Sequence, residues 1–286
     1  MKKNRFAALL AAAVLCVSAL TACSQNAGQP TNPTSNPDSS NSSQRSAPAD
    51  LLAQIQERGE IVVAMEGTWA PWTYHDENDQ LVGYDVEVAQ NIAQRLGVEV
   101  NFAEGEWDGL LAGLDSGRYD IMVNGVDIDE ARSEKYDFST PYAYNRTAVI
   151  VSGDNDSIQS MEDLNGKSTA NTLNSTYANV AESYGAEVTG VDDFIQTIEL
   201  LNSGRIDATL NAEVSYYDYM AQHPEANIKI ACIDPASTQV AIPMRKGEES
   251  AALVAAINEA LAEMAEDGTL TDLSIKYFGT DISQEQ

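Results

Sequence analysis

Apolar and polar residues alternate along the chain in the pattern of short strands and amphipathic helices. Residues 60–65 form a short apolar run typical of a buried strand, whereas residues 85–96 and 251–266 repeat apolar side chains at the spacing of one helix face. Gly97 and Gly268 follow these two helices, as expected where a helix ends. Strands that alternate with helices in this way predict an α/β fold.

One segment of the pattern occurs twice. Residues 114–120 read LDSGRYD and residues 201–207 read LNSGRID, so each copy combines a helix end, a Gly stop, a charged residue and a short strand. An Asn follows eight residues after the Ser of each copy, at Asn124 and Asn211. The equal spacing predicts two lobes of similar architecture, and we expect Asn124 and Asn211 to face each other across a cleft.

Residues 124–127 form a polar elbow after an apolar strand, and the short helical stretch after the elbow carries Arg132. In a protein this acidic, an Arg close to Asp127 suits a small molecule that has both a carboxylate and an ammonium group. The sequence therefore predicts that the elbow and Arg132 form half of an amino-acid site. The alternative for Arg132 is an ordinary surface salt bridge.

Two further segments are candidate walls of the same site. Residues 66–72 follow the strand at 60–65 with Glu66, Trp69 and Trp72, and ligand sites in open α/β sheets lie at the carboxyl ends of strands. The alternative is that the two Trp side chains belong to the core. Ser and Thr at 175–176 precede a helix, where they cap backbone N–H groups and where free N–H groups bind carboxylates; capping alone would explain them equally well.

Charge and composition exclude several functions. The 286 residues contain 16 Lys and Arg against 44 Asp and Glu, a net charge of −28 that rules out a nucleic-acid partner. Two His residues do not suffice for a His-rich metal site, and three Cys residues give no disulfide framework. We expect no metal and no cofactor.

The N-terminal residues resemble the signal peptide of a bacterial lipoprotein. Three basic residues precede the apolar run at 6–20, which matches a secretory signal and is short for a membrane span of ~20 residues. The run ends in LTAC at 20–23, which resembles the lipobox of bacterial lipoproteins. That resemblance implies a signal peptide over 1–22 and a diacylglyceryl group on Cys23, and the alternative is ordinary secretion with an incidental Cys. Residues 23–49, rich in Ser, Asn, Pro and Gln, predict a flexible tether, so we expect an extracytoplasmic domain held at the cell membrane by lipid.

Five motifs together resemble the extracytoplasmic solute-binding proteins of polar amino-acid ABC importers. They are GYDV at 83–86, WDGL at 107–110, SGRYD at 116–120, YDFS at 136–139 and the C-terminal stretch 267–279. The likeness covers 50–281 and is nearest to the cystine/cysteine-binding branch, through NGV at 124–126, EKYDF at 134–138 and DATLN at 207–211. It implies a two-lobe clamshell of the type II periplasmic-binding-protein fold. Its expected parts are lobe 1 at 50–141 and 240–281, lobe 2 at 147–234, hinges at 142–146 and 235–239, and a tail at 282–286.

The resemblance also implies roles for residues. Arg132 matches the position that grips the ligand's α-carboxylate, which a planar guanidinium does with two hydrogen bonds. The helix start in lobe 2 adds donors, Trp69 and Trp107 match the aromatic pair that sandwiches the ligand side chain, and Glu66 matches the reader of its far end. The full expected ligand set is Glu66, Trp69, Trp107, Asn124, Gly125, Asp127, Arg132, Asn174, Ser175, Thr176 and Asn211.

Two positions depart from the family pattern together. The elbow carries Asp127 where the family has Ser or Thr, and Ala212 stands where the family has the Asp that pairs with the ligand's α-ammonium. Since an unpaired ammonium in a closed cleft costs several kcal/mol, we expect Asp127 to take over this role, alone or with Glu213. The rival explanation is a ligand without an ordinary α-ammonium group.

The leading hypothesis is therefore a monomeric, lipid-anchored protein that captures a polar amino acid, with cystine or cysteine as best guess, and delivers it to an ABC permease. The second hypothesis is an enzyme of the same fold, a dehydratase-like lyase that acts on a small carboxylic acid. Paired acids such as Glu66 and Asp127 could perform acid–base chemistry. Against an enzyme, the sequence contains no nucleophile–base constellation and no phosphate loop.

Overall fold

The computed structural model describes residues 50–285. The predicted signal peptide at 1–22, the tether at 23–49 and the lipid-anchor candidate Cys23 lie outside the described residues. Among the helices of residues 50–285, none combines the length and the apolar character that crossing a bilayer requires.

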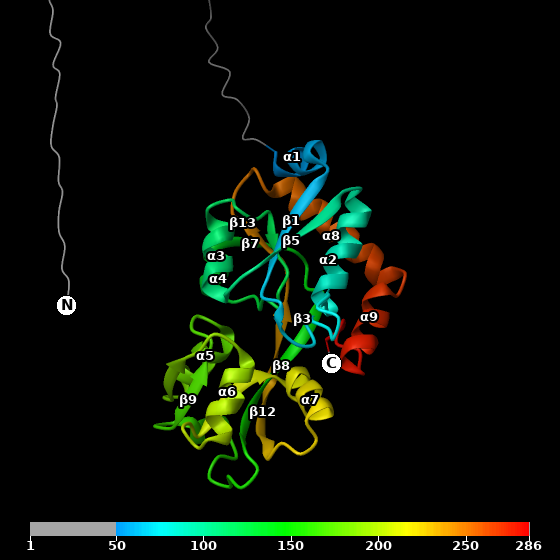
Figure 1. Ribbon diagram of the computed structural model, residues 1–286. Coiled ribbons are helices and arrows are strands. Elements are labelled where there is room, and N and C mark those ends of the chain that lie inside the picture. The colour runs from blue at the N-terminus through cyan, green and yellow to red at the C-terminus, as the bar shows by residue number, and fades with distance from the viewer. Residues whose placement is uncertain (1–49, 286) are drawn as a thin grey trace, which may run out of the picture. The chain divides into compact units, whose positions relative to one another are not determined.

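Lobe 1 is built on a three-stranded parallel sheet in the order β5-β1-β6 (Figure 1). Strand β1 lies in the middle, and its Val63 and Ala64 are fully buried and pair with both neighbouring strands. The strands are β1 (Glu60–Met65), β5 (Glu99–Glu104) and β6 (Ile121–Met122), and the helices around them are α1 (Leu51–Arg58), α2 (Tyr84–Leu96), α3 (Trp107–Asp115), α4 (Glu130–Lys135), α8 (Ala251–Glu266) and α9 (Thr269–Phe278).

Two small antiparallel sheets complete lobe 1. The first, β2-β3-β4, follows β1 directly and carries Trp69 on its first strand. The second pairs β7 with β13 and so joins the C-terminal part of the chain back to the first lobe. Their strands are β2 (Thr68–Trp69), β3 (Thr73–His75), β4 (Leu81–Val82), β7 (Tyr136–Phe138) and β13 (Pro243–Arg245).

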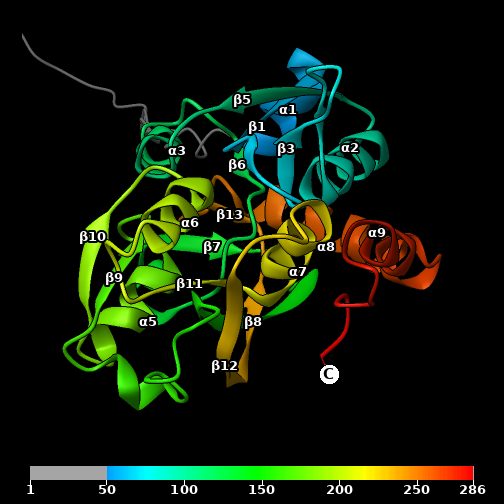
Figure 2. The same ribbon diagram turned by 60° about the horizontal axis from the view of Figure 1, so that its bottom comes forward.

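Lobe 2 contains a five-stranded mixed sheet in the order β10-β9-β11-β8-β12, with helices α5, α6 and α7 around it (Figure 2). Its elements are β8 (Ala143–Ser152), η1 (Met161–Leu164), β9 (Ser168–Asn171), α5 (Thr176–Ser183), β10 (Glu187–Gly190), α6 (Phe194–Asn202), β11 (Ala208–Ala212), α7 (Glu213–Gln222) and β12 (Ile228–Val240).

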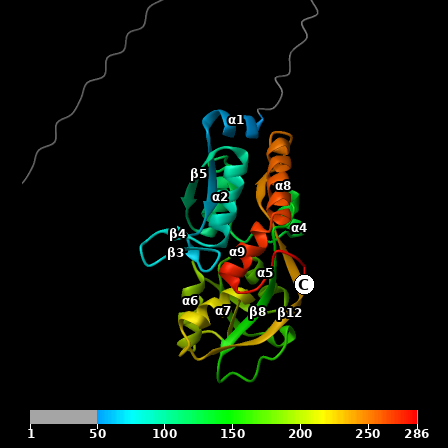
Figure 3. The same ribbon diagram turned by 90° about the vertical axis from the view of Figure 1, so that its right-hand side faces the viewer.

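Two paired strands connect the lobes. Strands β8 and β12 run side by side in opposite directions, with Tyr144 opposite Gln239 and Arg146 opposite Ser237 (Figure 3). These pairs fall in the segments 142–146 and 235–239. The two hinges were expected from the sequence in these same segments. That the lobes move relative to each other by bending there stays a prediction.

The repeated sequence segment forms the same local structure in both lobes. A Ser caps the C-terminus of each helix, α3 and α6, and the following Gly117 and Gly204 adopt positive φ angles of 73° and 68°. The Asp that closes each segment then accepts a hydrogen bond from the neighbouring strand, Asp120 from the backbone N of Val62 at 2.7 Å and Asp207 from that of Ser168 at 2.8 Å. The short repeat thus sets how a helix joins its sheet in each lobe.

Candidate functional site

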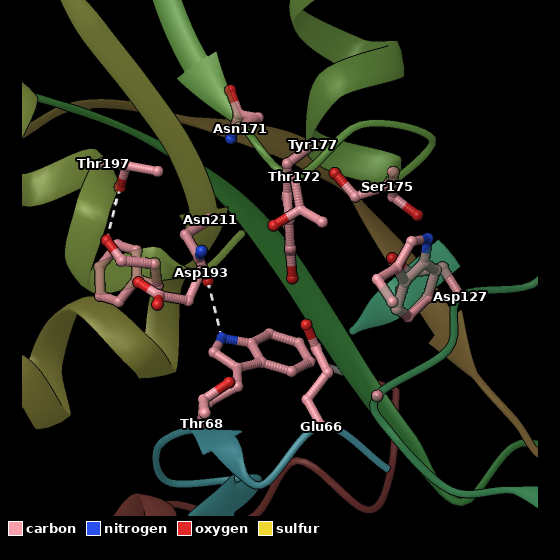
Figure 4. Close-up of a pocket in the computed structure, with 15 residues that line it drawn as sticks. Glu66, Thr68, Asp127, Asn171, Thr172, Ser175, Tyr177, Asp193, Thr197 and Asn211 are labelled. Atoms are coloured by element: carbon pink, nitrogen blue, oxygen red, sulfur yellow. Dashed lines mark hydrogen bonds between the residues drawn. The ribbon is translucent and has the colours of Figure 1, made fainter. Parts of the chain in front are cut away.

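A pocket between the lobes gathers most of the predicted site residues (Figure 4). Its cavity volume is about 50 Å³. Eight of the eleven expected ligand residues line it, namely Glu66, Trp69, Trp107, Gly125, Asp127, Ser175, Thr176 and Asn211. The three expected residues outside the lining are Asn124, Arg132 and Asn174.

The lobe 1 wall rests on stacked tryptophans. Trp69 lines the pocket and stacks on the fully buried Trp72, with ring centroids 5.4 Å apart and planes 20° apart. Each of the two alternatives therefore holds for one Trp residue. Trp72 belongs to the core, and Trp69 belongs to the wall of the pocket. Gly125 of the elbow has φ +55° and lies so close that an added Cβ would stand 2.6 Å from the Trp69 ring. Only glycine allows this approach of the elbow to the indole.

Glu66 is a partly buried acid on the lobe 1 side of the pocket. The pKa of its carboxyl is raised to about 7, chiefly by burial and also by the charges of Glu106 and Asp193, while the hydrogen bond from Asn124 opposes the rise. Asn124 holds Glu66 from both ends, because its Nδ2 donates to the carboxylate at 2.7 Å and its Oδ1 accepts from the Glu66 backbone N at 2.8 Å. The expectation that Asn124 faces Asn211 was wrong. Asn124 is fully buried behind the wall, and Trp69 is the residue that reaches Asn211, at 3.1 Å from Nε1 to Oδ1.

Asp127 presents an unsatisfied carboxylate oxygen at the other side of the pocket. It is 4% exposed, and its Oδ1 has no partner in hydrogen-bond geometry among residues 50–285, although the Thr176 and Thr238 hydroxyls lie near enough to the carboxyl to affect its pKa. Burial raises the pKa of this carboxyl, while the hydroxyls of Thr238 and Thr176 and the charge of Arg132 act in the opposite direction. A buried carboxylate oxygen without a partner fits a site for a cationic donor on a ligand.

Arg132 bridges the two lobes beside Asp127. Its Nη1 donates to the Asp127 carbonyl at 2.9 Å and to the Thr176 hydroxyl at 3.0 Å, and its Nη2 donates to the Asn174 carbonyl at 3.1 Å. Nε lies 3.3 Å from an Asp129 carboxylate oxygen, and the guanidinium packs over Trp107 at 5.2 Å from the ring centroid. Arg132 is thus no exposed salt bridge. Three of its five N–H donors make hydrogen bonds to protein groups and Nε forms an ion pair, so a two-bond grip on a ligand carboxylate requires some of these contacts to open.

The start of α5 supplies the lobe 2 end of the site. The Ser175 hydroxyl accepts from the Ala178 backbone N at 3.2 Å, so the capping expected from sequence is present while Ser175 also lines the pocket. Asn174 takes the left-handed conformation with φ 60°. Its side chain turns away from the pocket to donate to Asp108 of lobe 1 at 3.0 Å, which makes it a contact between lobes.

The rest of the lobe 2 wall, and Thr68 of lobe 1, were not predicted from the sequence. Seven lining residues were not predicted, namely Thr68, Asn171, Thr172, Tyr177, Asp193, Phe194 and Thr197. Asp193 and Thr197 belong to the ordinary start of α6, and Asn171 ends β9, so their only sequence signals were a helix cap and a strand end. Glu213, expected as a helper of Asp127, instead pairs with Arg146 at 2.7 Å in a separate cavity beside the crossing strands.

In the part of the chain from 50 to 285, no three His, Cys, Asp or Glu side chains come together as a metal site would require. The pocket instead offers carboxylates, hydroxyls, amides and aromatic faces, which are the usual groups for a small polar molecule.

A comparison with family models matches residues 61–280 to the bacterial extracellular solute-binding proteins, family 3. This match covers most of the chain and both lobes. The chain belongs to this family.

Individual relatives agree with the family. The solute-binding protein is 41% identical to the L-cystine-binding protein TcyA of Bacillus subtilis over 236 aligned residues. The alignment covers 82% of this chain and 87% of TcyA. An ancestral arginine-binding protein bound to arginine matches with 38% identity and a TM-score of 0.72, over 78% of this chain and 99% of the other. The L-cystine solute receptor of Neisseria gonorrhoeae, in its unliganded open conformation, matches with 37% identity and a TM-score of 0.57, over 83% and 100%. The predicted two-lobe α/β fold of the type II class is confirmed.

The two structural matches also indicate how the lobes are arranged. At nearly equal identity, this solute-binding protein agrees better with the arginine-bound structure than with the open one. The direct hydrogen bonds between the lobes, from Trp69 to Asn211 and from Arg132 to Thr176, fit that difference. The described arrangement is therefore a closed one.

Proposed function

We propose that this solute-binding protein captures cystine between its lobes and delivers it to an ABC permease. The name of TcyA and that of the gonococcal receptor support this ligand, because both carry the word cystine and both resemble the chain over most of its length. The aromatic wall supports it as well, since Trp69 and Trp107 offer faces to the polarizable sulfur atoms of a disulfide.

The observation that carries the proposal is the unpartnered Oδ1 of Asp127. It lies beside Thr176 and the start of α5, where backbone N–H groups and Arg132 favour a carboxylate. An acceptor for an ammonium group next to donors for a carboxylate is the recognition pattern for an α-amino acid. In this proposal Asp127 replaces the acid that is missing at Ala212, and in the closed cleft the ligand carboxylate takes the place of part of the protein contacts of Arg132.

We also propose that the mature protein is anchored to the cell membrane by a lipid on Cys23. The LTAC motif at 20–23 and the polar stretch that follows support this location. Mass spectrometry of the protein from a membrane fraction should find diacylglycerol on Cys23, and Cys23→Ser should release the protein from the membrane. Recovery of an unmodified protein at the membrane would contradict the anchor.

The direct test of the ligand is to purify residues 50–286 without denaturation and to identify the co-purified small molecule by mass spectrometry. We expect cystine, in a one-to-one ratio with the protein. Another amino acid would overturn the choice of cystine, and the absence of any amino acid, with no response to added ones in a thermal-shift screen, would overturn the class. Incubation of the complex should return cystine unchanged; turnover of the bound molecule would instead support the lyase alternative.

A further inference from the structure

A second cavity lies beside the strands that connect the lobes. Its volume is about 340 Å³, and we call it the rear cavity. The residues that line it come from four segments, 144–146 of β8, 235–237 of β12, 213–217 of α7 and 278–282 at the end of the chain. Figure 1 shows this end of the chain next to β8 and α7.

Strand β8 separates the rear cavity from the pocket between the lobes. Successive side chains of a strand point to opposite faces. The Asn145 side chain donates from Nδ2 to the Tyr177 hydroxyl at 3.1 Å, and Tyr177 lines the pocket. The neighbours Tyr144 and Arg146 line the rear cavity on the other face of the strand. The pocket and the rear cavity therefore lie on opposite sides of the predicted hinge.

Helix α7 supplies the lobe 2 wall of the rear cavity. Arg146 of β8 forms an ion pair with Glu213 in the first turn of α7, with Nη2 and Oε2 2.7 Å apart. Val214 and Tyr217, which lie one turn apart on α7, line the cavity next to this ion pair. The Tyr217 side chain is 54% exposed, so this wall has apolar surface that no other part of the described chain covers.

The end of the chain supplies the lobe 1 wall. The buried Ser274 hydroxyl of α9 donates to the Thr280 carbonyl at 2.9 Å and accepts from the Ile282 backbone N at 2.7 Å. Ile282, the first residue of the expected tail, is 5% exposed, and its carbonyl accepts from the Tyr144 backbone N at 2.7 Å. Residues 278–282 are thus fixed to α9 of lobe 1 and reach the connecting strand.

The two walls belong to different lobes, so the width of the rear cavity depends on the angle between the lobes. When two bodies turn about a hinge that lies between a front gap and a rear gap, one gap widens as the other narrows. In the closed arrangement of the pocket the rear cavity is wide. Opening of the pocket would bring Val214 and Tyr217 toward residues 278–282, and the apolar surface buried there would stabilise the open form.

We infer that the residues of the rear cavity set the equilibrium between the open and closed forms, and with it the affinity for the ligand. Val214 and Thr280 are positioning residues in this scheme, because they act on the ligand only through the angle between the lobes. The inference rests on the proposed function for the identity of the ligand, whereas the equilibrium itself exists without any ligand.

The test fills the rear cavity from each wall in turn. Val214→Phe enlarges a partly buried side chain of the lobe 2 wall, and Thr280→Phe enlarges an exposed side chain of the lobe 1 wall. Each larger side chain fits the wide cavity of the closed form and collides with the facing wall when the pocket opens. Val254→Phe, a partly buried position of α8 outside the pocket and the rear cavity, is the matched control.

Titration with cystine and stopped-flow measurement of its release give the first result. We expect Val214→Phe and Thr280→Phe each to bind cystine at least about fivefold more tightly than the wild type, through a smaller dissociation rate constant. Val254→Phe should bind like the wild type. Because Thr280 is exposed, Thr280→Phe decides the question if Val214→Phe does not fold. Unchanged or weaker binding in the rear-cavity variants would overturn the inference.

Small-angle X-ray scattering of the ligand-free proteins separates this inference from the proposed function. The radius of gyration of Val214→Phe and Thr280→Phe should be smaller than that of the wild type and of Val254→Phe, because the closed form is more populated. Equal radii would overturn the role of the rear cavity and leave the proposed function standing. If the wild type does not bind cystine, the choice of cystine is overturned, and the ligand-free radii still decide the inference.

Discussion

At the scale of single residues, burial decides the chemistry of the site. Glu66, Asp85 and Asp127 are all acids whose carboxyl pKa is raised chiefly because they are buried. The neighbouring residues in the sequence do not reveal this burial. An Asp that follows a strand has the same local sequence pattern whether its side chain faces water or the other lobe. The proposed site therefore depends on acids that are costly to ionise until a positive ligand arrives.

Glu66 should make ligand binding depend on pH. With a pKa of about 7 in the free protein, the carboxyl is largely protonated at pH 6. A ligand cation nearby lowers that pKa, so binding releases a proton and the affinity for cystine should rise several-fold between pH 6 and pH 7.5. Titrations across this range should show a much flatter dependence for Glu66→Gln. An equal slope in both proteins would exclude Glu66 as the group responsible.

At the scale of elements, helix α2 ties the elbow to the first connecting strand. Asp85, in the first turn of α2, accepts from the Gly125 backbone N at 2.6 Å through Oδ2 and from the Tyr142 hydroxyl at 2.7 Å through Oδ1. Tyr142 directly precedes β8, the strand that leads into lobe 2. One fully buried carboxylate thus fixes the pocket wall relative to the crossover.

Asp85 should also set a pH dependence of stability. Its pKa is raised from 3.8 to about 7 by burial, although the bonds to Tyr142 and Gly125 oppose the rise. Because the folded state holds the proton more tightly than the unfolded chain, the free energy of unfolding should fall as the pH rises from about 4 to 7, and then level off. Urea unfolding should show this fall reduced in Asp85→Asn by a few kcal/mol at most, and unchanged in the exposed control Glu57→Gln. A fall of equal size in Asp85→Asn would contradict this role.

The elements were largely predictable from sequence, whereas the lobe 2 side of the site was predictable only in part, through Ser175, Thr176 and Asn211. Hydrophobic periodicity and the repeated segments indicated two α/β lobes because Gly117 and Gly204 end equivalent helices. The lobe 1 wall followed from residues at strand ends. The lobe 2 acid Asp193 was missed because its signal is that of any helix cap, and the role of Asn124 was mistaken because its partner Glu66 is 58 residues away.

At the scale of the whole described domain, contacts between the lobes stabilise the closed arrangement. The hydrogen bond from Asn174 to Asp108 joins the lobes at the edge of the pocket, outside its lining. Asp108 is exposed and lies in the first turn of α3. It can therefore be changed without altering any group that lines the pocket.

Asp108→Ala should speed ligand release without slowing capture. The lost bond acts only after closure, so the dissociation rate constant of cystine should rise about two- to tenfold while the association rate constant stays the same. Stopped-flow measurement of tryptophan fluorescence would follow both rate constants. Glu130→Ala, which removes an equally exposed acid from the first turn of α4, is the control and should change neither. A slower association, or an unchanged dissociation rate constant, would argue against this role of the hydrogen bond from Asn174 to Asp108.

Calorimetric titration of cystine into ligand-free wild type and Asp127→Asn tests whether Asp127 holds the α-ammonium group of cystine. We predict saturable one-to-one binding to the wild type and an affinity at least about tenfold weaker for Asp127→Asn, since a buried charged pair is lost. Equal affinities in the two proteins would contradict the claim.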